Sequence, residues 1–278
     1  MRPLLLPPLL LLLLPVLVHA AAPAILTLAD RPVRLIRGTV LYKAVNGTAL
    51  QRDDIVETED VGARFDTGTA IVALGPRTRV RLAMLPGDGK PVTEIALLQG
   101  WVKLAAHGRA RVVAPLLQVC VPDGVTVVHS DGGKAAVLAE AGEQQVVHQI
   151  GAGRLRRTLR PLGEQYAAFE AGELKAVGRA PRDFVAALPP ALRATLQAVP
   201  ALPYAGQVPP VKERDVSHAD LVHWQAAPPP LRRGLGARLR PRLADPSFRS
   251  EFETPPGERA GWRTVLHPVG ACRGGCCT

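Results

Sequence analysis

The sequence is poor in aromatic residues, serine and long apolar runs. Phe, Trp and Tyr make up only 4% of its 278 residues, so a core must be built mainly from Val, Leu and Ala. Only four serines occur, at positions 130, 217, 247 and 250, and none lies in a Gly-x-Ser-x-Gly elbow. Because that elbow is absent, the nucleophile motif of the α/β-hydrolases is excluded. After the first 20 residues, no segment reaches the roughly 20 apolar residues that a membrane-spanning helix needs.

The N-terminus predicts export. Met1-Arg2 is followed by an apolar run from Leu4 to Val18 that three prolines interrupt. A short apolar run after a positive charge, ending in small residues, is typical of a secretory signal peptide. We therefore expect residues 1–20 to be a signal peptide and the mature chain to be soluble in the periplasm or otherwise exported. An uncleaved membrane anchor is the alternative.

Charge predicts anionic partners. Basic residues exceed acidic ones by ten, and most of them are arginine. Such an excess favours nucleic acid, lipid head groups or acidic glycans. Since an exported protein rarely meets nucleic acid, we expect no nucleic-acid partner and retain anionic glycan or lipid head groups. The alternative is that the arginine content reflects the composition of the genome.

Two arginine-rich segments are the candidate contacts with an anionic surface or partner. Residues 151–160 carry no acidic residue and are expected to form a charged surface loop. In the second segment, Leu231, Leu235 and Leu239 recur every four residues, as in a basic amphipathic helix. Such a helix would lie on lipid head groups or pack on the rest of the protein with its arginines in solvent. The candidate contact residues are Arg154, Arg156, Arg157, Arg160, Arg232, Arg233, Arg238 and Arg240.

Strand patterns dominate the chain from Ile25 to about Val147. Apolar and polar residues alternate in segments of four to six residues, with turns every eight to twelve. Asn46-Gly47 is the strongest turn signal, because both residues tolerate a positive φ. We predict a mainly β fold of many short strands, solenoid-like or sandwich-like, with Trp101 filling the core between layers.

Beyond Pro181 the pattern becomes helical. Helices are expected over 182–188, 191–197, 218–225 and 231–239, each kept short by proline-rich breaks. Ser217 and Asp220 match the capping box that begins a helix. The predicted organisation is a signal peptide (1–20), a β domain (25–178), a proline-rich helical extension (179–268) and a disordered cysteine-rich tail (269–278).

Cysteine usage gives no unique pairing. Cys120 stands alone in a strand-like segment, while Cys272, Cys276 and Cys277 crowd the C-terminus. Four cysteines allow three pairings, and the sequence does not choose among them. The C-terminal spacing, without an inserted histidine, does not indicate a metal site.

Three segments, residues 50–58, 63–74 and 97–104, together resemble the FecR domain, a bacterial envelope module. The family pattern Leu-x-x-Gly-Asp-x-Ile-x-Thr is matched between Leu50 and Thr58, with aspartate in place of the glycine, and aspartate tolerates a left-handed turn. The segment 63–74 resembles the next strand-turn-strand, and 97–104 resembles the family's Leu-x-x-Gly strand. The family-pattern positions are Leu50, Asp53, Asp54, Ile55, Thr58, Gly68 and Gly100.

The resemblance covers about residues 30–175 and implies a non-catalytic module of the cell envelope. The iron-transport regulators that name the family carry a cytoplasmic sigma-factor-binding region, whereas this sequence opens on an export signal, so an anti-sigma role is disfavoured. We expect a protein-binding or scaffolding function, with another envelope protein as the partner. A periplasmic sensor that signals through a partner is the alternative.

The candidates for catalysis are weak. The run Asp215–Asp220 contains Ser, His and Asp, but triads assemble from distant positions, and a helix cap explains the run better. Glu57 with Glu59 or Asp60 is the one acidic pair that a glycan-cleaving envelope enzyme could use. We therefore expect no enzyme activity, no cofactor, no metal and no small-molecule substrate.

Overall fold

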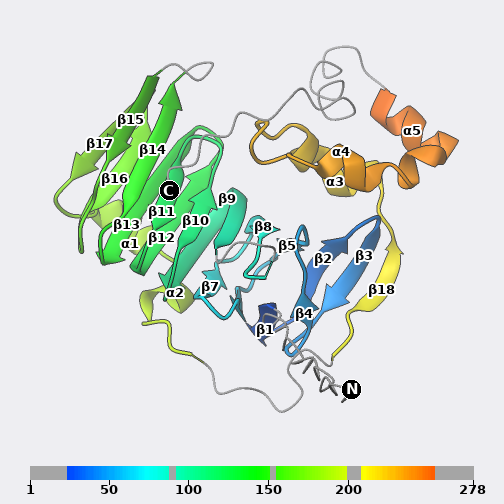
Figure 1. The fold of residues 1–278 in the computed structure, drawn as a ribbon, viewed down its shortest axis with the longest axis horizontal. Helices are drawn as coiled ribbons and strands as arrows, with labels where there is room; N and C mark the ends of the chain where they lie inside the picture. The colour runs from blue at the N-terminus through cyan, green and yellow to red at the C-terminus, as the bar shows by residue number, and fades with distance from the viewer. Residues whose placement is uncertain (1–23, 88–91, 151–154, 199–207, 254–278) are drawn as a thin grey trace, which may run out of the picture.

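The protein is mainly β, as the sequence predicts, with a few short helices near the C-terminus. The computed structural model describes residues 24–87, 92–150, 155–198 and 208–253. The strands join into one continuous sheet, which folds over into two facing layers (Figure 1). Among the described residues, neighbouring strands are antiparallel except for the parallel pair β9 and β10.

The two layers share strand β9 (Thr93–Ala106), whose first half belongs to layer B and second half to layer A. Layer A contains, in spatial order, β4 (Ala49–Leu50), β1 (Ala24–Ala29), β6 (Ala63–Asp66), β7 (Ala70–Leu74), β9, β12 (Gly124–Asp131), β13 (Lys134–Ala141), β16 (Tyr166–Glu170) and β17 (Glu173–Val177). Layer B contains β18 (Val211–Asp215), β3 (Val40–Ala44), β2 (Val33–Arg37), β5 (Ile55–Glu57), β8 (Arg79–Met84), β9, β10 (Ala110–Val113), β11 (Gln118–Val121), β14 (Gln145–Ile150) and β15 (Leu155–Leu159).

Gly100 lies where β9 passes from one layer to the other. Its φ is +94°, and a Cβ built on it would lie 2.4 Å from Oγ1 of Thr78. Only glycine fits both the conformation and the space. The family-pattern glycine at this position is therefore required by the bend that joins the layers.

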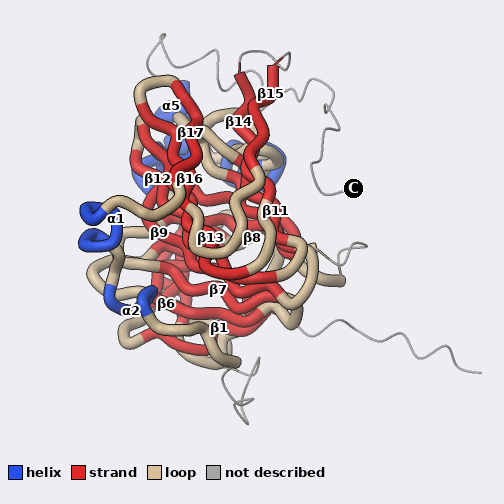
Figure 2. The backbone as a smooth tube through the Cα atoms, turned by 90° about the vertical axis from the view of Figure 1, so that its left-hand side faces the viewer, coloured by secondary structure: helices blue, strands red, loops and turns tan. Residues whose placement is uncertain are grey.

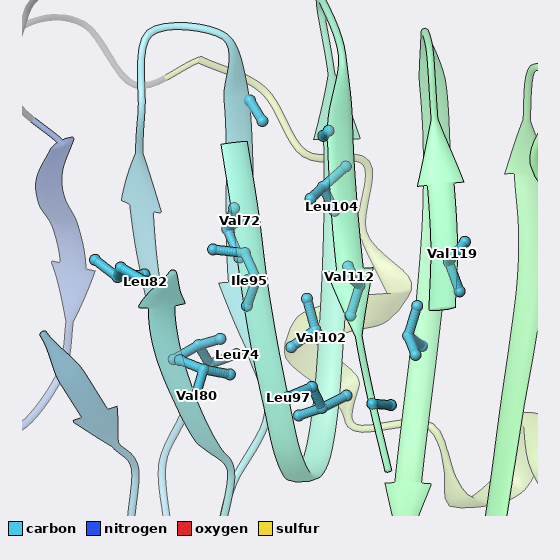
Figure 3. Close-up of a cluster of buried hydrophobic side chains, with 14 of the residues drawn as sticks. Val72, Leu74, Val80, Leu82, Ile95, Leu97, Val102, Leu104, Val112 and Val119 are labelled. Carbon is cyan, nitrogen blue, oxygen red and sulfur yellow. The ribbon is translucent and has the colours of Figure 1, made fainter. Parts of the chain in front are cut away.

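The main core lies between the two layers. Figure 3 shows aliphatic side chains from β7, β8, β9, β10 and β11 filling this space. Val72 and Leu74 of β7 and Val102 of β9 are at most 1% exposed. Alternation along each strand places these residues inward and their neighbours outward. The scarcity of aromatic residues is met by a core made of Val, Leu, Ile and Ala.

Helices cover the outer face of each layer. On layer A, α1 (Arg182–Ala187) and α2 (Pro190–Arg193) pack over β7, β12, β13 and β16, and both lie along one side of the tube in Figure 2. On layer B, α3 (His218–Gln225), α4 (Leu235–Leu239), the 3-10 helix η1 (Arg242–Ala244) and α5 (Pro246–Glu253) pack over β2, β3 and β5. No helix in the described ranges is long and apolar enough to cross a membrane.

Trp101 does not fill the core between layers, and that expectation was wrong. The side chain lies on the outer face of layer A, where its ring stacks on His129 at 4.0 Å and contacts Phe184 of α1 at 5.2 Å. Alternation explains the error, because Val102 and Leu104 already occupy the inner face and Trp101 must point the other way.

The extension contributes more than helices. Strand β18 lies within it and pairs with β3 at the edge of layer B (Figure 1), in a region where the sequence predicts only extended linkers. The helix predicted over 218–225 is confirmed, whereas α4 begins only at Leu235, after Gly234 with a φ of +77°. Cys120 is buried in β11. The predicted signal peptide, the tail 269–278 and its three cysteines lie outside the described residues.

Candidate functional site

Four of the seven family-pattern positions lie in the turn before β5 or directly beside it. Leu50 and Ile55 are buried at 2% and 0% exposure and anchor the turn on both sides. Asp53 has a φ of +67°, so the expectation that aspartate adopts the left-handed turn here is confirmed. These positions shape the backbone, and their side chains are directed inward rather than offered to a ligand.

Asp54 closes the same turn and binds β2. Its carboxylate accepts the N–H of Gln51 at 2.8 Å and pairs with both ends of the Arg37 guanidinium at 2.9 and 2.6 Å. Burial raises the pKa of Asp54, and the hydrogen bonds from Arg37 and Gln51 oppose that rise. A two-pronged Arg–carboxylate contact fixes orientation as well as charge.

Thr58 and Gly68 also have structural roles. The hydroxyl of Thr58 donates to the carbonyl of Gly75 at 2.6 Å and accepts the N–H of Thr78 at 2.9 Å, which holds the start of β8. Gly68 has a φ of +80° in the tight turn between β6 and β7, where its N–H donates to Asp66. Thr58 and Gly68 therefore stabilise the turns that join neighbouring strands.

Asp53 is brought together with Arg238, a predicted contact residue 185 positions later. One oxygen of Asp53 lies 2.5 Å from Nη1 of Arg81 and 3.6 Å from Nη1 of Arg238 in α4. Arg81 also donates to the carbonyl of Leu231 at 3.1 Å. Burial lowers the pKa of the Arg238 guanidinium. Arg238 therefore binds within the protein and is not a surface contact.

A second set of ion pairs lies beside the first. Asp220 of α3 is 2.9 Å from Arg34 of β2 and 2.6 Å from Arg214 of β18. Arg34 continues to Glu57, which also lies 3.5 Å from Arg79. We call the two sets together the charged interface, which joins layer B to its helices and consists of Arg34, Arg37, Asp53, Asp54, Glu57, Arg79, Arg81, Arg214, Asp220 and Arg238.

The ionisation of the acidic residues in this interface follows from burial and pairing. Burial raises the pKa of Glu57, although the positive charges of Arg34 and Arg79 oppose the rise. Burial also works against ionised Asp220, but hydrogen bonds from Arg214 and Ser217 outweigh it and hold the pKa of Asp220 far below its usual range. The cap interpretation is consistent with this, since Asp220 accepts the N–H of Ser217 at 2.8 Å.

Two of the residues weighed for catalysis, Asp220 and Glu57, are held in ion pairs. The oxygens of Asp220 are bound by Arg34, Arg214 and Ser217, and Glu57 is 8% exposed. Glu59 and Asp60 are exposed after the end of β5. Within the described residues, His, Cys, Asp and Glu side chains form no group of three that could hold a metal ion.

The leucine repeat of the second arginine-rich segment faces the protein. Leu231, Leu235 and Leu239 are at most 1% exposed, and Leu235 and Leu239 pack with Trp224 on layer B. No apolar face of this repeat remains for a lipid surface, so packing on the protein is confirmed, but the arginines are not all in solvent, because the Arg238 side chain is only 16% exposed. Arg232 donates to the carbonyl of Gln225 at 3.1 Å, while Arg233 and Arg240 are exposed to solvent.

The first arginine-rich segment lies at the far end of the two layers. Its residues 155–159 form strand β15 where a loop is expected. Arg157 reaches across from β15 to Glu173 of β17 at 3.2 Å, and Arg160 lies 3.7 Å from Glu143. Arg154 is outside the described residues, and of Arg156 only the backbone, in β15, is described. The structure therefore separates these arginines from those of α4 and its flanks.

The last strands of the two layers form a pair of open edges. Among the described residues, β15 pairs only with β14, and β17 pairs only with β16, both without register irregularities. The ion pair between Arg157 and Glu173 places the two edges side by side, and Figure 1 shows β15 and β17 at the same end of the molecule. We call β15 and β17 the terminal edges.

Exposed apolar side chains occur in β17 and in the segments before and after it, as they also do at Leu28, Val45 and Val211 near β1, β3 and β18. Val177 of β17 is 50% exposed and lies opposite Tyr166. Tyr166 contacts Phe184 at 4.9 Å, and the next residue, Val185, is 49% exposed. Leu162, in the turn between β15 and β16, is 52% exposed. The sequence analysis did not predict this group. The signal available was Val177, the last residue of the last strand-like segment before Gly178, since a final strand can lie at the edge of a sheet.

The opposite end of the layers is protected against further pairing. There, β18 carries four charged residues out of five and has a register shift between Lys212 and Arg214. In layer A the end strand β4 has only two residues, and β1 next to it is bulged between Leu26 and Leu28. Charges, bulges and short strands are the devices that block edge pairing. Only the end formed by the terminal edges has regular strands of five residues in both layers.

Comparison with known proteins leaves the family open. Neither a protein-family model nor a curated protein matches this sequence. Two crystal structures of a protein from Parabacteroides distasonis, proposed to be an anti-sigma factor, are similar with TM-scores of 0.40 and identities of 13% and 12%. Each match covers 48% of this chain and 62% or 63% of the other, so the match spans less than two thirds of those proteins. At that level the likeness carries no functional argument, and the FecR resemblance stays a prediction.

Proposed function

We propose that the protein is a non-catalytic, exported binding module of the bacterial cell envelope, and that it binds a partner protein at the terminal edges. The observation that carries the proposal is the pair of regular, one-sided strands β15 and β17 lying side by side. An unpaired strand presents a row of backbone donors and acceptors that an extended segment of another protein can satisfy.

The surroundings of the terminal edges support this proposal. Helices cover the outer faces of both layers over β2, β5, β7 and β12, and the opposite end is blunted by charges and bulges. Val177, half exposed at the end of β17, gives an incoming segment apolar surface to cover. A partner protein fits such a mixture of backbone and apolar groups better than a lipid or glycan does.

A matched pair of variants tests the proposal. The full chain is immobilised as wild type, as Val177→Asp in β17 and as Val211→Asp in β18, and is exposed to envelope extract of its own organism. Both valines are exposed at an outer strand, at 50% and 66%, so neither change disturbs a core. We expect one protein to be retained by wild type and Val211→Asp but reduced at least about tenfold by Val177→Asp.

Salt separates specific binding from charge attraction. A protein held through backbone pairing and apolar contacts stays bound when screening shortens the Debye length to about 3 Å at 1 M salt. Retention that Val177→Asp leaves unchanged would contradict binding at the terminal edges. Retention that vanishes at high salt for wild type and Val211→Asp alike would assign it to charge attraction alone.

The non-catalytic part of the proposal has its own test. Glu57 is paired with Arg34 and covered by Trp224, which leaves Glu59 and Asp60 as the exposed acids of the enzyme alternative. Purified protein incubated with peptidoglycan is expected to release no soluble fragments. Release that disappears in a Glu59→Gln, Asp60→Asn double variant would overturn the proposal.

A further inference from the structure

The terminal edges carry charge of predominantly one sign. Residues 145–182, which run from β14 to the start of α1, contain seven basic residues and three acidic ones. From 151 to 163 there are four arginines and no acidic residue. Anything that adds a strand to β15 therefore meets a local excess of positive charge.

The arginines of this region are only weakly engaged. The side chains of Arg157 and Arg160 are 46% and 70% exposed, and their partners Glu173 and Glu143 are 50% and 58% exposed. Exposed ion pairs of this kind contribute little, because water and salt screen them. Both guanidinium groups can therefore exchange these partners for carboxylates of an incoming chain.

A second copy of the protein is the wrong occupant on charge grounds. Antiparallel pairing of two β15 strands would place two copies of the segment Leu155–Leu159, each with two adjacent arginines, against one another. Like charges directly across a strand pair are destabilising. The sequence of β15 therefore acts against self-pairing and favours a chain of opposite charge.

We propose that the partner bound at the terminal edges contributes an acidic extended segment, which adds to β15 as a further strand and sets its carboxylates against Arg157 and Arg160. The inference rests on the proposed binding at these edges and specifies the chemistry of the partner. Backbone hydrogen bonds supply strand addition, and the arginines select for acidic side chains.

Two soluble peptides test the charge requirement. Each has about seven residues, the length of an ordinary strand, with threonine alternating with glutamate in one and with glutamine in the other. We measure binding to the full chain by fluorescence anisotropy and locate it by amide hydrogen exchange. The glutamate peptide is expected to bind at least about tenfold more tightly than the glutamine peptide and to slow exchange in β15.

Matched charge reversals assign the effect to residues. Arg157→Glu with Arg160→Glu is expected to abolish the difference between the peptides. Arg31→Glu with Arg109→Glu changes the net charge equally at exposed turns outside the terminal edges and is expected to leave the difference intact.

The outcomes are distinguishable from failure of the proposed function. Equal binding of the two peptides would overturn the acidic partner while leaving the Val177→Asp result untouched. Binding of phosphatidylglycerol vesicles that depends on Arg157 and Arg160, without slowed exchange in β15, would overturn it in favour of a lipid surface. A dimer that slows exchange in β15 without peptide would overturn it in favour of a second copy.

Discussion

The two outer faces of the sandwich are covered by helices in different ways. On layer A, Phe184, Leu188 and Leu192 of α1, α2 and their connection pack on aliphatic and aromatic side chains, and a single buried amine, Lys103, crosses the contact. On layer B, an apolar cluster around Trp224 is bordered by the charged interface. Apolar contact is non-directional, whereas Arg–carboxylate pairs require a defined geometry.

The difference shows that the helices on layer A are positioned mainly by apolar contacts, whereas those on layer B are positioned mainly by ion pairs. Lys103 is 1% exposed and donates to the carbonyls of Leu192 and Ala194 at 3.0 and 2.9 Å. It therefore satisfies backbone carbonyls at the C-terminal end of α2. Lys103 also pairs with Glu140 of β13 at 2.7 Å, so one buried cation with its carboxylate helps to hold α2 on layer A. On layer B the orientation of α3 and α4 is fixed by ion pairs from β2, β18 and the turn before β5. Removing one partner there leaves a buried charge without compensation.

The largest expected effect compares the two tryptophans of these faces. Trp224→Ala should cost about 3–5 kcal/mol, because the side chain is fully buried against Ile36 and Ile55 and leaves a cavity. Trp101→Ala should cost only about 1–2 kcal/mol, because that side chain is partly exposed. Urea unfolding of both variants measures the difference, and equal costs would contradict the distinction between a buried anchor and a partly exposed contact.

Asp53→Gly tests whether the charged interface or the turn matters more. Glycine relieves the positive φ, which alone would stabilise by about 1 kcal/mol, but the change removes the carboxylate that faces Arg81 and Arg238. We expect a net loss of about 2 kcal/mol in the free energy of unfolding. Asp53→Asn, which keeps the turn preference and removes only the charge, is the control and should also destabilise. A gain in stability for Asp53→Gly would mean that the turn alone decides the residue.

Part of this difference between the two faces could be predicted from the sequence. Alternation places Trp101 and Lys103 on the face opposite Val102 and Leu104, so the outward orientation of both could have been recognised. The left-handed Asp53 and the cap at Ser217 were recognised, because turn and cap preferences act over a few residues. Turns and helix caps can therefore be predicted from the few residues that form them.

The ion pairs between residues far apart in the sequence could not be predicted from it. Nothing near Arg238 in the sequence indicates Asp53, and an arginine beside a leucine repeat suits a solvated helix face equally well. Strand β18 was missed because four of its five residues are charged, so it lacks the apolar alternation typical of a strand. Such charges are typical of a strand that is protected against edge pairing. The terminal edges depend on which strands lack neighbours, and that is a property of topology and not of any one segment.

Lys103→Met tests the buried amine of layer A, which also lies 2.7 Å from the carboxylate of Glu140 in β13. Methionine keeps the length of the side chain but leaves the carbonyls of Leu192 and Ala194 without the buried donor. We expect a cost of about 1–2 kcal/mol, with faster hydrogen exchange in α2 and unchanged exchange in α3. Faster exchange in both helices would mean that the two covers are not independent.

Acid should loosen the two faces in sequence, and this is the smallest of the expected effects. Burial lowers the pKa of His129, which stacks on Trp101, so the folded state resists a proton that the unfolded chain accepts. Stability linked to His129 is present above its ordinary value of 6.5 and falls as pH drops below it. The pKa of Asp220 is also lowered, so its contribution is present above 3.8 and is lost only as pH falls below that value.

Single-tryptophan variants separate the two events. Trp262→Phe combined with Trp224→Phe leaves Trp101 as the reporter of layer A, and Trp262→Phe combined with Trp101→Phe leaves Trp224 as the reporter of layer B. His223→Gln is added to both reporter chains, because burial lowers the pKa of His223, next to Trp224, as it lowers that of His129. In that background the fluorescence of Trp101 should change first as pH falls below 6.5, and that of Trp224 only at lower pH, where Glu57 and then Asp220 take up protons. His129→Gln should remove the first change and Asp220→Asn should weaken the second. If both reporters respond together at one pH, the faces respond as one cooperative unit and the contrast between apolar and ionic covers has no consequence for stability.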